Sequence, residues 1–415
     1  MALAGRTVVV ALSGGIACYK ACEVVRLLER AGATVRVVMT AGAREFVTPL
    51  TLQTLSGAPV ATDVFDLTQE SEIGHIRLAD TADALVVVPA TANVIAKLAH
   101  GIADDLLGTI ALATRAPLLV APAMNVNMWE HPATRQNLAT LVARGARVVG
   151  PGVGSLACGW EGAGRLAEPA DVVEGVEALL APQDLAGEHV LVSAGPTREA
   201  VDPVRYLSNH SSGKMGWAVA RVARRRGAEV TLVAGPTSLA PIPGVRHVAV
   251  QSAAEMAAAL GDAFARATVL VMAAAVADWR VRRPAAQKMK KVGRRLVLEL
   301  ERTPDILAGL AAGKGRRLVV GFAAETERMA EEARRKLREK RCDLVVGNDV
   351  TAEGAGFGAD TNVVRLVDAS GLDELLPVLP KDEVAGRILD WVAARRARPR
   401  RLRAMRGGAA TRRRA

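Results

Sequence analysis

The sequence predicts an α/β protein that contains two doubly wound, mostly parallel β-sheets. The first observation is a start that occurs twice: β-branched residues run into a small-residue turn at 8–15 and again at 190–197. A buried strand that delivers such a turn into a helix is how a nucleotide-binding α/β domain begins. The second observation is the sequence Gly-Ala-x-Val, which starts at Gly32, Gly145 and Gly227 and leads each time from a helix into a strand. Together they indicate two Rossmann-like domains.

The repeated start divides the chain of 415 residues. We expect one domain over 1–181, a short linker at 182–186, a second domain over 187–394 and an Arg-rich tail over 395–415. Either domain is large enough to bury a hydrophobic core of its own.

The positive charge of the chain is concentrated in the tail. The formal net charge is +11, and ten arginines without any acid lie in 395–415, so the remainder carries only +1. A segment of Arg, Ala, Gly and Pro cannot bury enough apolar surface to order itself, which predicts a disordered extension. The alternative is an anion- or RNA-binding arm.

The composition indicates a globular cytoplasmic protein. Half of the residues are apolar. No apolar run approaches the ~18 residues of a membrane span, so no membrane partner is expected. The four cysteines have no disulfide-scaffold spacing, as in a reducing compartment, and no cluster offers four ligands at zinc spacing.

The first turn is predicted to hold an anion. A strand over Val8–Leu12 leads through Ser13-Gly14-Gly15 into a helix that Gly32 closes, and a strand over Thr34–Met39 follows. The third glycine of a dinucleotide fingerprint is absent, and no acid follows the second strand to take a ribose hydroxyl. A flavin mononucleotide has one phosphate and therefore needs fewer of these features in the turn. A mere tight turn is the other interpretation.

Polar side chains follow the next strands. His75 lies in the first turn of a predicted helix, where a lone histidine is more often structural. Thr91 and Asn93 end one buried strand, and Asn125 follows another, at the carboxyl edge where ligands bind. An amide there can hold a carboxylate without itself titrating.

The segment 150–164 has six glycines in fifteen residues. Such a composition predicts neither a stable helix nor a stable strand. We interpret it as a mobile lid that carries Cys158, with a plain surface loop as the alternative.

Four motifs in this half resemble the flavin-dependent cysteine decarboxylases, specifically the phosphopantothenoylcysteine decarboxylases of coenzyme A biosynthesis. They are Ser13–Ala17, Gly74–Ile76, Pro122–Trp129 and Ala157–Gly159, in matching order and spacing over about residues 5–180. The resemblance implies a flavodoxin-like flavoprotein. It also implies that FMN is bound by Ser13, Gly14, Gly15, Thr40, Pro89, Ala90 and Thr91.

The same resemblance implies a catalytic role for three residues. A plain cysteinyl carboxylate has no electron sink, and oxidation of its thiol by the flavin to a thioaldehyde supplies one. His75 would assist proton removal, and Asn125 would hold the carboxylate. After carbon dioxide leaves, Cys158 on the closed lid would donate the proton that completes reduction of the enethiol, away from water.

In the second half, Ser/Asn/Gly residues over 208–216 precede a helix that runs through Arg225. Such a cluster is typical of an anion-holding turn, although it lacks Walker-loop spacing and could be an ordinary capped helix.

A buried strand over 269–277 ends in Asp278. The lysines at 288–291 would usually be solvated surface. A later predicted helix carries Lys336 and Lys340 one turn apart.

This half resembles the phosphopantothenate–cysteine ligases over about residues 187–392. The motifs are 194–199, 208–216, 274–278, 288–291 and 321–326. The resemblance implies that Asn209 holds an acyl-cytidylate, that Lys288 stabilises charge while it forms, and that Mg²⁺ accompanies the triphosphate through ligands the sequence does not identify. The implied CTP-binding residues are Met272, Ala273, Ala274, Asp278, Lys288, Pro304, Asp305, Ile306, Leu307, Phe322, Lys336 and Lys340.

We therefore expect a bifunctional enzyme that joins 4'-phosphopantothenate to L-cysteine with CTP and then decarboxylates the product to 4'-phosphopantetheine. Related decarboxylases form trimers and related ligases form dimers, which implies a homo-oligomer built from both. The alternatives are a nicotinamide-dependent dehydrogenase, disfavoured by the absent acid after each second strand, and an RNA-associated protein, supported only by the tail.

Overall fold

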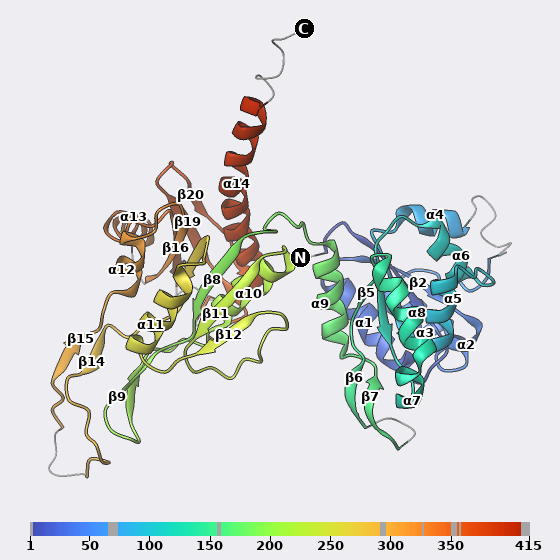
Figure 1. Cartoon of the computed structure of the whole chain (residues 1–415), viewed down its shortest axis with the longest axis horizontal. Helices are drawn as coiled ribbons and strands as arrows, with labels where there is room; N and C mark the ends of the chain where they lie inside the picture. Colours follow the sequence, from blue (N-terminus) through green and yellow to red (C-terminus); the bar gives the residue numbers. More distant parts are fainter. Residues whose placement is uncertain are drawn as a thin grey trace, which may run out of the picture. The chain divides into compact units, whose positions relative to one another are not determined.

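The computed structural model describes residues 3–64, 74–155, 159–290, 296–325, 328–349, 355–356 and 358–407. The chain forms two compact units that divide between Ala181 and Pro182 (Figure 1). Each unit is a mixed α/β body with a sheet at its centre, so the predicted fold class is confirmed. In the described part of the chain, no helix is both long enough and apolar enough to span a bilayer.

The first unit is built on five parallel strands in the order β2-β1-β3-β4-β5. This is the flavodoxin-like order, in which the chain changes direction across the sheet between β1 and β3. Its elements are β1 (Thr7–Leu12), α1 (Cys18–Arg30), β2 (Thr34–Met39), α2 (Ala41–Arg44), α3 (Pro49–Ser56), α4 (Gly74–Thr81), β3 (Ala84–Ala90), α5 (Ala92–His100), α6 (Leu106–Ala113), β4 (Leu118–Pro122), α7 (Val126–Glu130), α8 (Pro132–Ala143), β5 (Arg147–Val148), β6 (Gly152–Ser155), β7 (Glu161–Arg165) and α9 (Pro169–Leu180).

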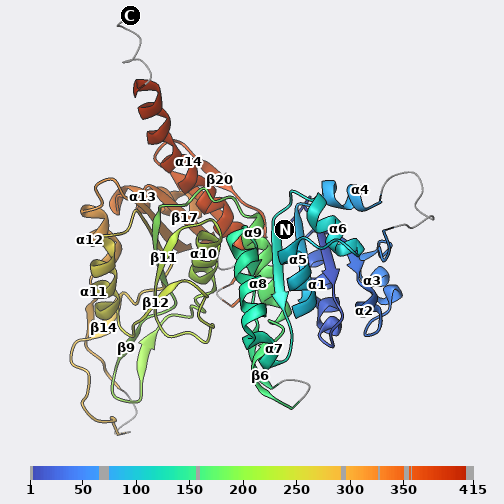
Figure 2. The same cartoon turned by 45° about the vertical axis from the view of Figure 1, so that its right-hand side comes forward.

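Helices cover both faces of this sheet. Helices α1, α3 and α9 pack on one face, and α5, α6 and α8 pack on the other (Figures 1 and 2). Helix α1 turns Ala21, Val24, Val25 and Leu28 inward at helical spacing. Strand β3 is buried at every position, as expected of a parallel strand covered on both sides.

The glycine-rich segment differs from its prediction. Strands β6 and β7 pair antiparallel across it, so the expectation that it forms no strand is wrong. The glycines are needed for close approach: a Cβ at Gly164 would lie 2.3 Å from the carbonyl oxygen of Met124, and one at Gly162 would lie 2.9 Å from Val126. Cys158 lies outside the described residues.

The second unit is built on an eight-stranded sheet in the order β12-β11-β8-β13-β16-β17-β19-β20. The first six strands are parallel and follow the Rossmann order, with the change of direction between β8 and β13, and two antiparallel strands extend the edge. Helices α10 and α14 pack on one face, and α11, α12 and α13 pack on the other.

The elements of this unit are β8 (His189–Ala194), β9 (Arg198–Ala200), β10 (Tyr206–Ser208), α10 (Lys214–Arg225), β11 (Glu229–Ala234), β12 (Arg246–Ala249), α11 (Ala253–Phe264), β13 (Val269–Met272), β14 (Trp279–Val281), β15 (Leu300–Arg302), α12 (Ile306–Ala312), β16 (Leu318–Glu325), α13 (Met329–Glu339), β17 (Leu344–Asp349), β18 (Thr361–Asn362), β19 (Val364–Asp368), β20 (Asp373–Leu375), β21 (Leu379–Pro380) and α14 (Lys381–Gly407).

The predicted linker and tail differ from the structure at their inner ends. Leu185 is fully buried in the core of the second unit, and Asp184 pairs with the buried Arg226 at 2.5 Å. Helix α14 continues past residue 394: Arg395 pairs with Asp368, and Arg396 Nε donates to Glu188 at 2.8 Å. Oppositely charged residues from distant segments pair with Asp184, Arg395 and Arg396, so the local composition alone could not reveal that these positions pack.

Candidate active sites

The first candidate site lies where β1 and β3 diverge, at the carboxyl edge of the first sheet. Ser13 follows β1 and is fully buried. Its Oγ donates to the carbonyl oxygen of Pro89 at 2.7 Å and accepts from the Thr91 N–H at 3.0 Å. One hydroxyl therefore joins the ends of the two strands at the point where open α/β sheets bind ligands.

Glycines and helix starts surround that hydroxyl. A Cβ at Gly14 would lie 2.8 Å from the carbonyl carbon of Gly42, so only glycine fits there, whereas one at Gly15 would make an ordinary 3.6 Å contact with Thr91. Thr91 Oγ1 accepts from the Val94 N–H at 3.4 Å and caps α5. All seven residues predicted to bind FMN thus lie at the ends of β1, β2 and β3, beside the start of a helix that favours an anion.

Two of the three predicted decarboxylase residues are in the described part of the chain. His75 lies in the first turn of α4, and its Nδ1 is buried without a hydrogen-bond partner among the described residues. An unpaired buried polar atom costs about 1–3 kcal/mol, so this nitrogen is able to form a hydrogen bond with a bound group. Asn125 caps α7 by accepting from the Asn127 N–H at 2.8 Å. The third residue, Cys158, lies outside the described residues, so its catalytic role stays a prediction.

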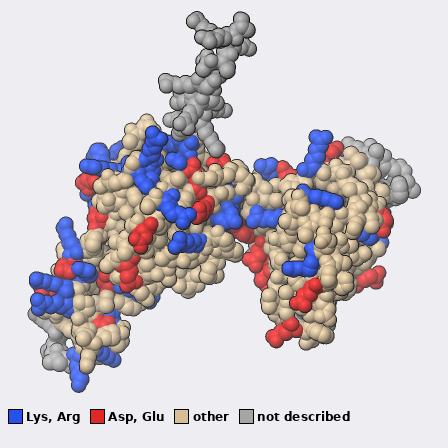
Figure 3. Space-filling model, viewed as in Figure 1, with Lys and Arg blue, Asp and Glu red and all other residues tan. Residues whose placement is uncertain are grey.

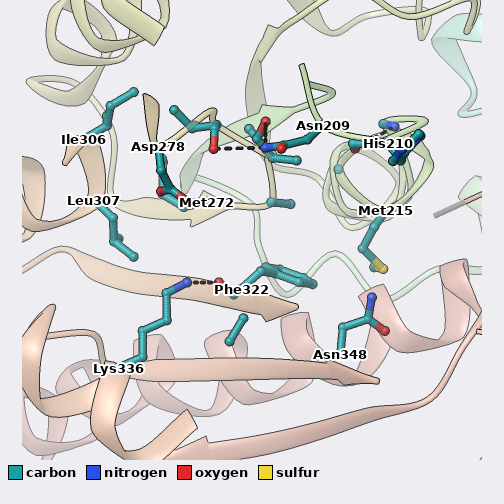
Figure 4. A pocket seen from close by; sticks show the side chains of 18 of the residues that line it. Asn209, His210, Met215, Met272, Asp278, Ile306, Leu307, Phe322, Lys336 and Asn348 are labelled. Carbon is teal, nitrogen blue, oxygen red and sulfur yellow. Dashed lines mark hydrogen bonds between the residues drawn. The ribbon is translucent and has the colours of Figure 1, made fainter. Parts of the chain in front are cut away.

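The second candidate site is a cavity of about 1060 Å³ at the carboxyl edge of the second sheet (Figure 4). The turn before α10, the ends of β13, β16 and β17, and the start of α12 line it, and α13 supplies lysines. Every predicted CTP-binding residue except Lys288 lies in its wall, and so does Asn209. The motifs of the second half therefore predicted most of this wall.

Hydrogen bonds to backbone groups fix the wall of the cavity that is at the top of Figure 4. Asn209 Nδ2 donates to the carbonyl oxygens of Ala275 at 3.2 Å and Val276 at 3.1 Å (Figure 4). The Ala274 N–H donates to Ser193 Oγ at 3.2 Å, across the gap between β8 and β13. The turn that leads into α10 is thereby held to the end of β13.

The opposite wall is basic. Lys336 Nζ donates to the carbonyl oxygen of Phe322 at 2.5 Å (Figure 4), and Lys340 pairs with Asp305. Asp305 also caps α12 by accepting from the Ala308 N–H at 2.9 Å. Burial alone would raise the pKa of Asp305, but these hydrogen bonds to its charged form lower it. Two ammonium groups at the end of one helix suit a triphosphate.

Lys288 does not line the cavity. It is exposed in the segment between β14 and β15, whose residues 291–295 lie outside the description. Its neighbour Met289 is anchored: the Met289 N–H donates to Asp202 at 3.1 Å, and its carbonyl oxygen accepts from Arg205 at 3.0 Å. The Arg205 guanidinium holds the pKa of the Asp202 carboxyl well below its usual range.

Sequence reasoning missed polar residues on the α10 side of the cavity: His210, Lys214, Asn348, Asn362 and Lys381. Lys381 is almost fully buried, and its ammonium donates to the carbonyl oxygens of Gly356, Ala359 and Thr361. Burial, and after it the nearby Lys214, lowers the pKa of Lys381 to about 8. Only His210 and Lys214 belong to a motif that indicates this site.

Figure 3 shows the distribution of charge on one face of the protein. Lysines and arginines alternate with acids on the face shown in Figure 3, with no continuous basic patch across it. Among the described residues, no group of three or more His, Cys, Asp or Glu side chains could hold a metal ion.

Family comparisons match both units. The family described as Flavoprotein matches residues 2–181, and the DNA/pantothenate metabolism flavoprotein C-terminal domain matches residues 185–395. The Coenzyme A biosynthesis bifunctional protein CoaBC of Bacillus subtilis is 48% identical over 396 residues, which cover 94% of this chain and 98% of the relative. The protein of that name in Escherichia coli K12 is 46% identical over 400 residues, with 95% and 98% coverage.

Solved structures resemble each unit separately. The C-terminal domain of a Coenzyme A biosynthesis bifunctional protein CoaBC is 42% identical and covers 51% of this chain and 97% of its own, with a TM-score of 0.45. A PPC decarboxylase mutant complexed with pantothenoylaminoethenethiol is 32% identical and covers 41% and 96%, with a TM-score of 0.37. The dehydrogenase and RNA-associated alternatives find no support in any of these relatives.

Proposed function

This chain belongs to the family of bifunctional coenzyme A biosynthesis proteins and has a flavoprotein decarboxylase unit and a ligase unit, and from that premise we propose the substrates and residues that each unit uses. The second unit activates 4'-phosphopantothenate with CTP and joins it to L-cysteine. The first unit uses FMN to decarboxylate the product to 4'-phosphopantetheine. The cavity of about 1060 Å³ carries the proposal, because it has room for a nucleotide and a second substrate.

The residues of the first site fit a flavin mononucleotide. Gly14 lets the turn approach α2 closely, Thr91 starts a helix that can face one phosphate, and His75 presents a buried nitrogen without a partner among the described residues. When bound, the flavin supplies the two-electron oxidation of the substrate thiol. His75 takes a proton from the substrate, Asn125 orients its carboxylate, and Cys158 donates a proton at the end.

The residues of the second site fit an acyl-cytidylate. The start of α12 at 304–307 reads the base through backbone groups, and Lys336 and Lys340 neutralise phosphate charge. Asn209, held by two carbonyl groups, positions the intermediate. Mg²⁺ would be held mainly by phosphate oxygens, as is usual for this ion, and Asp278 is the carboxylate of the cavity wall that could contribute a ligand.

The assembly is a cytoplasmic homo-oligomer in which the first units form trimers and the second units form dimers. Large apolar side chains support both contacts. Tyr19 is 61% exposed and Leu50 is 70% exposed on the first unit, and Val204 and Tyr206 are exposed near β9 and β10 of the second.

Lys288 is exposed and lies outside the cavity wall, so pyrophosphate release tests whether it acts as the resemblance implies. If it is a preorganised donor, worth roughly 3 kcal/mol in the chemical step, Lys288→Gln should slow pyrophosphate release about a hundredfold with little change in CTP affinity. Lys290→Gln, two residues away in the same exposed segment, is the matched control and should behave as the wild type. Equal, modest losses in both variants would reduce the segment to a generic basic patch.

Asn209→Asp tests the positioning role separately. A carboxylate at that position would face the carbonyl oxygens of Ala275 and Val276 as well as the phosphate of the intermediate. The acyl-cytidylate should therefore form poorly or escape before L-cysteine attacks. Unchanged pyrophosphate release and unchanged product yield in this variant would remove Asn209 from the mechanism.

A further inference from the structure

The ligation requires a proton acceptor in the second cavity. L-cysteine arrives with its amino group protonated, and an ammonium nitrogen has no lone pair with which to attack a carbonyl carbon. A group near the intermediate must take that proton, and its ordinary pKa should lie close to the working pH. This inference rests on the proposed function.

The charged groups that line the cavity are mostly engaged. Lys340 pairs with Asp305, Lys214 pairs with Asp360, and Lys381 is held by three backbone carbonyls. The Asp278 carboxylate would be a weak base, since a carboxyl group ordinarily titrates near pH ~4. The charged side chains that face the cavity from the described elements are Lys214, Asp278, Arg302, Asp305, Arg335, Lys336, Lys340 and Lys381.

His210 differs from all of them. It lies on the turn between β10 and α10, lines the cavity and is exposed. The described residues provide no hydrogen-bond partner for its side chain, so neither ring nitrogen is committed to a structural role there. An imidazole is the side chain that ordinarily gains and loses a proton between about pH 5 and 8.

The turn holds His210 next to Asn209, the residue proposed to position the intermediate. On its N-terminal side, Ser208 Oγ donates to the carbonyl oxygen of Thr197 at 2.7 Å, and Asn209 is fixed to the end of β13 by two hydrogen bonds. Figure 4 shows Asn209 and His210 along the same wall, above Met215. A base one residue from the group that positions the intermediate can reach an amine that approaches its carbonyl carbon.

We propose that His210 is the general base for the attack of L-cysteine. A ring nitrogen takes one proton from the cysteine ammonium group, and the neutral amine forms the C–N bond at the acyl carbon. The bond between that carbon and the phosphate oxygen breaks, and CMP leaves with the electron pair. The second ammonium proton passes to water, and the exposed imidazolium then returns its proton to solvent.

The test separates the two half-reactions. Enzyme, CTP and 4'-phosphopantothenate are mixed first, pyrophosphate is measured, and an amine is then added. In His210→Gln, pyrophosphate release should stay within about twofold of wild type, whereas aminolysis by L-cysteine at about pH 7 should fall about a hundredfold. The loss should shrink to a few-fold at about pH 9, where more of the amine is already neutral.

Hydroxylamine provides an amine that is neutral near pH ~7 and needs no base. Its reaction with the intermediate should be unchanged in His210→Gln, which a merely structural role would not predict. His100→Gln, an exposed histidine of the first unit, is the matched control and should leave every rate unchanged.

Three outcomes would overturn the inference. Wild-type aminolysis by L-cysteine in His210→Gln near neutral pH would show that another group takes the proton. Equal slowing with L-cysteine and hydroxylamine would make His210 a structural residue. If the wild type releases no pyrophosphate before an amine is added, the proposed acyl-cytidylate route itself fails, and the role of His210 fails with it.

Discussion

Both units have a candidate site at the carboxyl edge of parallel strands, but the two sites differ in shape. Each has a fully buried serine at the end of its first strand, beside the point where the strand order reverses: Ser13 after β1 and Ser193 in β8. Ser13 bonds to both a carbonyl and an N–H at the end of β3, whereas Ser193 accepts from one N–H beyond β13.

The difference comes from the connection between the serine and the next helix. In the first unit the turn leads directly into α1, and Gly14 closes onto Gly42. In the second, the strands β9 and β10 intervene before α10, and the sheet edge opens into the large cavity. The short connection of the first unit therefore goes with a closed turn, and the longer connection of the second unit goes with an open cavity.

The largest expected effect on one unit alone comes from a substitution of Gly216. A Cβ there would lie 2.4 Å from that of Ala194 and 3.0 Å from the carbonyl oxygen of Ser193, so Gly216→Ala should push the start of α10 off the sheet. A displacement of about 1 Å can cost about a hundredfold in rate, and we expect at least that loss in pyrophosphate release. Flavin content, measured by absorbance, should be unchanged. A parallel loss of flavin would mean that the units do not act independently.

The corresponding change in the first unit is Gly14→Ala. Its Cβ would meet the Gly42 backbone at 2.8 Å, so the turn must open, and we expect roughly tenfold less bound flavin with normal ligase activity. Gly15→Ala is the neighbouring control because its Cβ would make only an ordinary contact with Thr91. It should leave the thermal unfolding of the unit unchanged. Equal flavin loss without unfolding in both would point to ligand contact at either glycine.

Substitutions of the two serines compare how much each hydroxyl stabilises its own unit. Ser13→Ala removes two hydrogen bonds: the Pro89 carbonyl keeps only the longer bond from the Ser13 N–H at 3.3 Å, and the Thr91 N–H loses its acceptor. This should cost about 2 kcal/mol in the free energy of unfolding of the first unit. Ser193→Ala frees a single N–H and should cost about 1 kcal/mol in the second. Urea titration measures both: flavin absorbance follows the first unit, and loss of pyrophosphate release follows the second, because tryptophans lie in both units. Equal costs would contradict the closed-versus-open distinction.

The last expected effect is a pH dependence at Lys381. Because the folded-state pKa is lowered to about 8, the folded chain releases this proton at a lower pH than the unfolded chain. The unfolded state then binds more protons between about pH 8 and 10, so stability contributed at this site rises with pH across that window, by at most ~1.4 kcal/mol per pH unit. The difference in urea midpoint between wild type and Lys381→Met should carry this slope. A flat difference would show that the three carbonyls keep the ammonium charged.

Local patterns predicted much of the fold. The strands near Val8 and Val190, the turns after them and the helix through Arg225 all form, because periodic burial and turn chemistry act over a few residues. The glycine-rich hairpin is the clear error. Its glycine-rich composition predicts no strand. The sequence does not show that Met124 and Val126 pack closely against these glycines in the folded chain.

The sequence by itself determined the fold class and the family, and its predicted residues make up much of the cavity wall, since motifs such as 208–216 and 274–278 carry their chemistry in adjacent residues. The tertiary structure alone decided that Lys288 lies outside that wall, that Lys381 is held by three carbonyls, and that Arg395 and Arg396 meet acids far along the chain. Burial and charge pairing depend on which distant segments the sheet brings together, and no local pattern encodes those contacts.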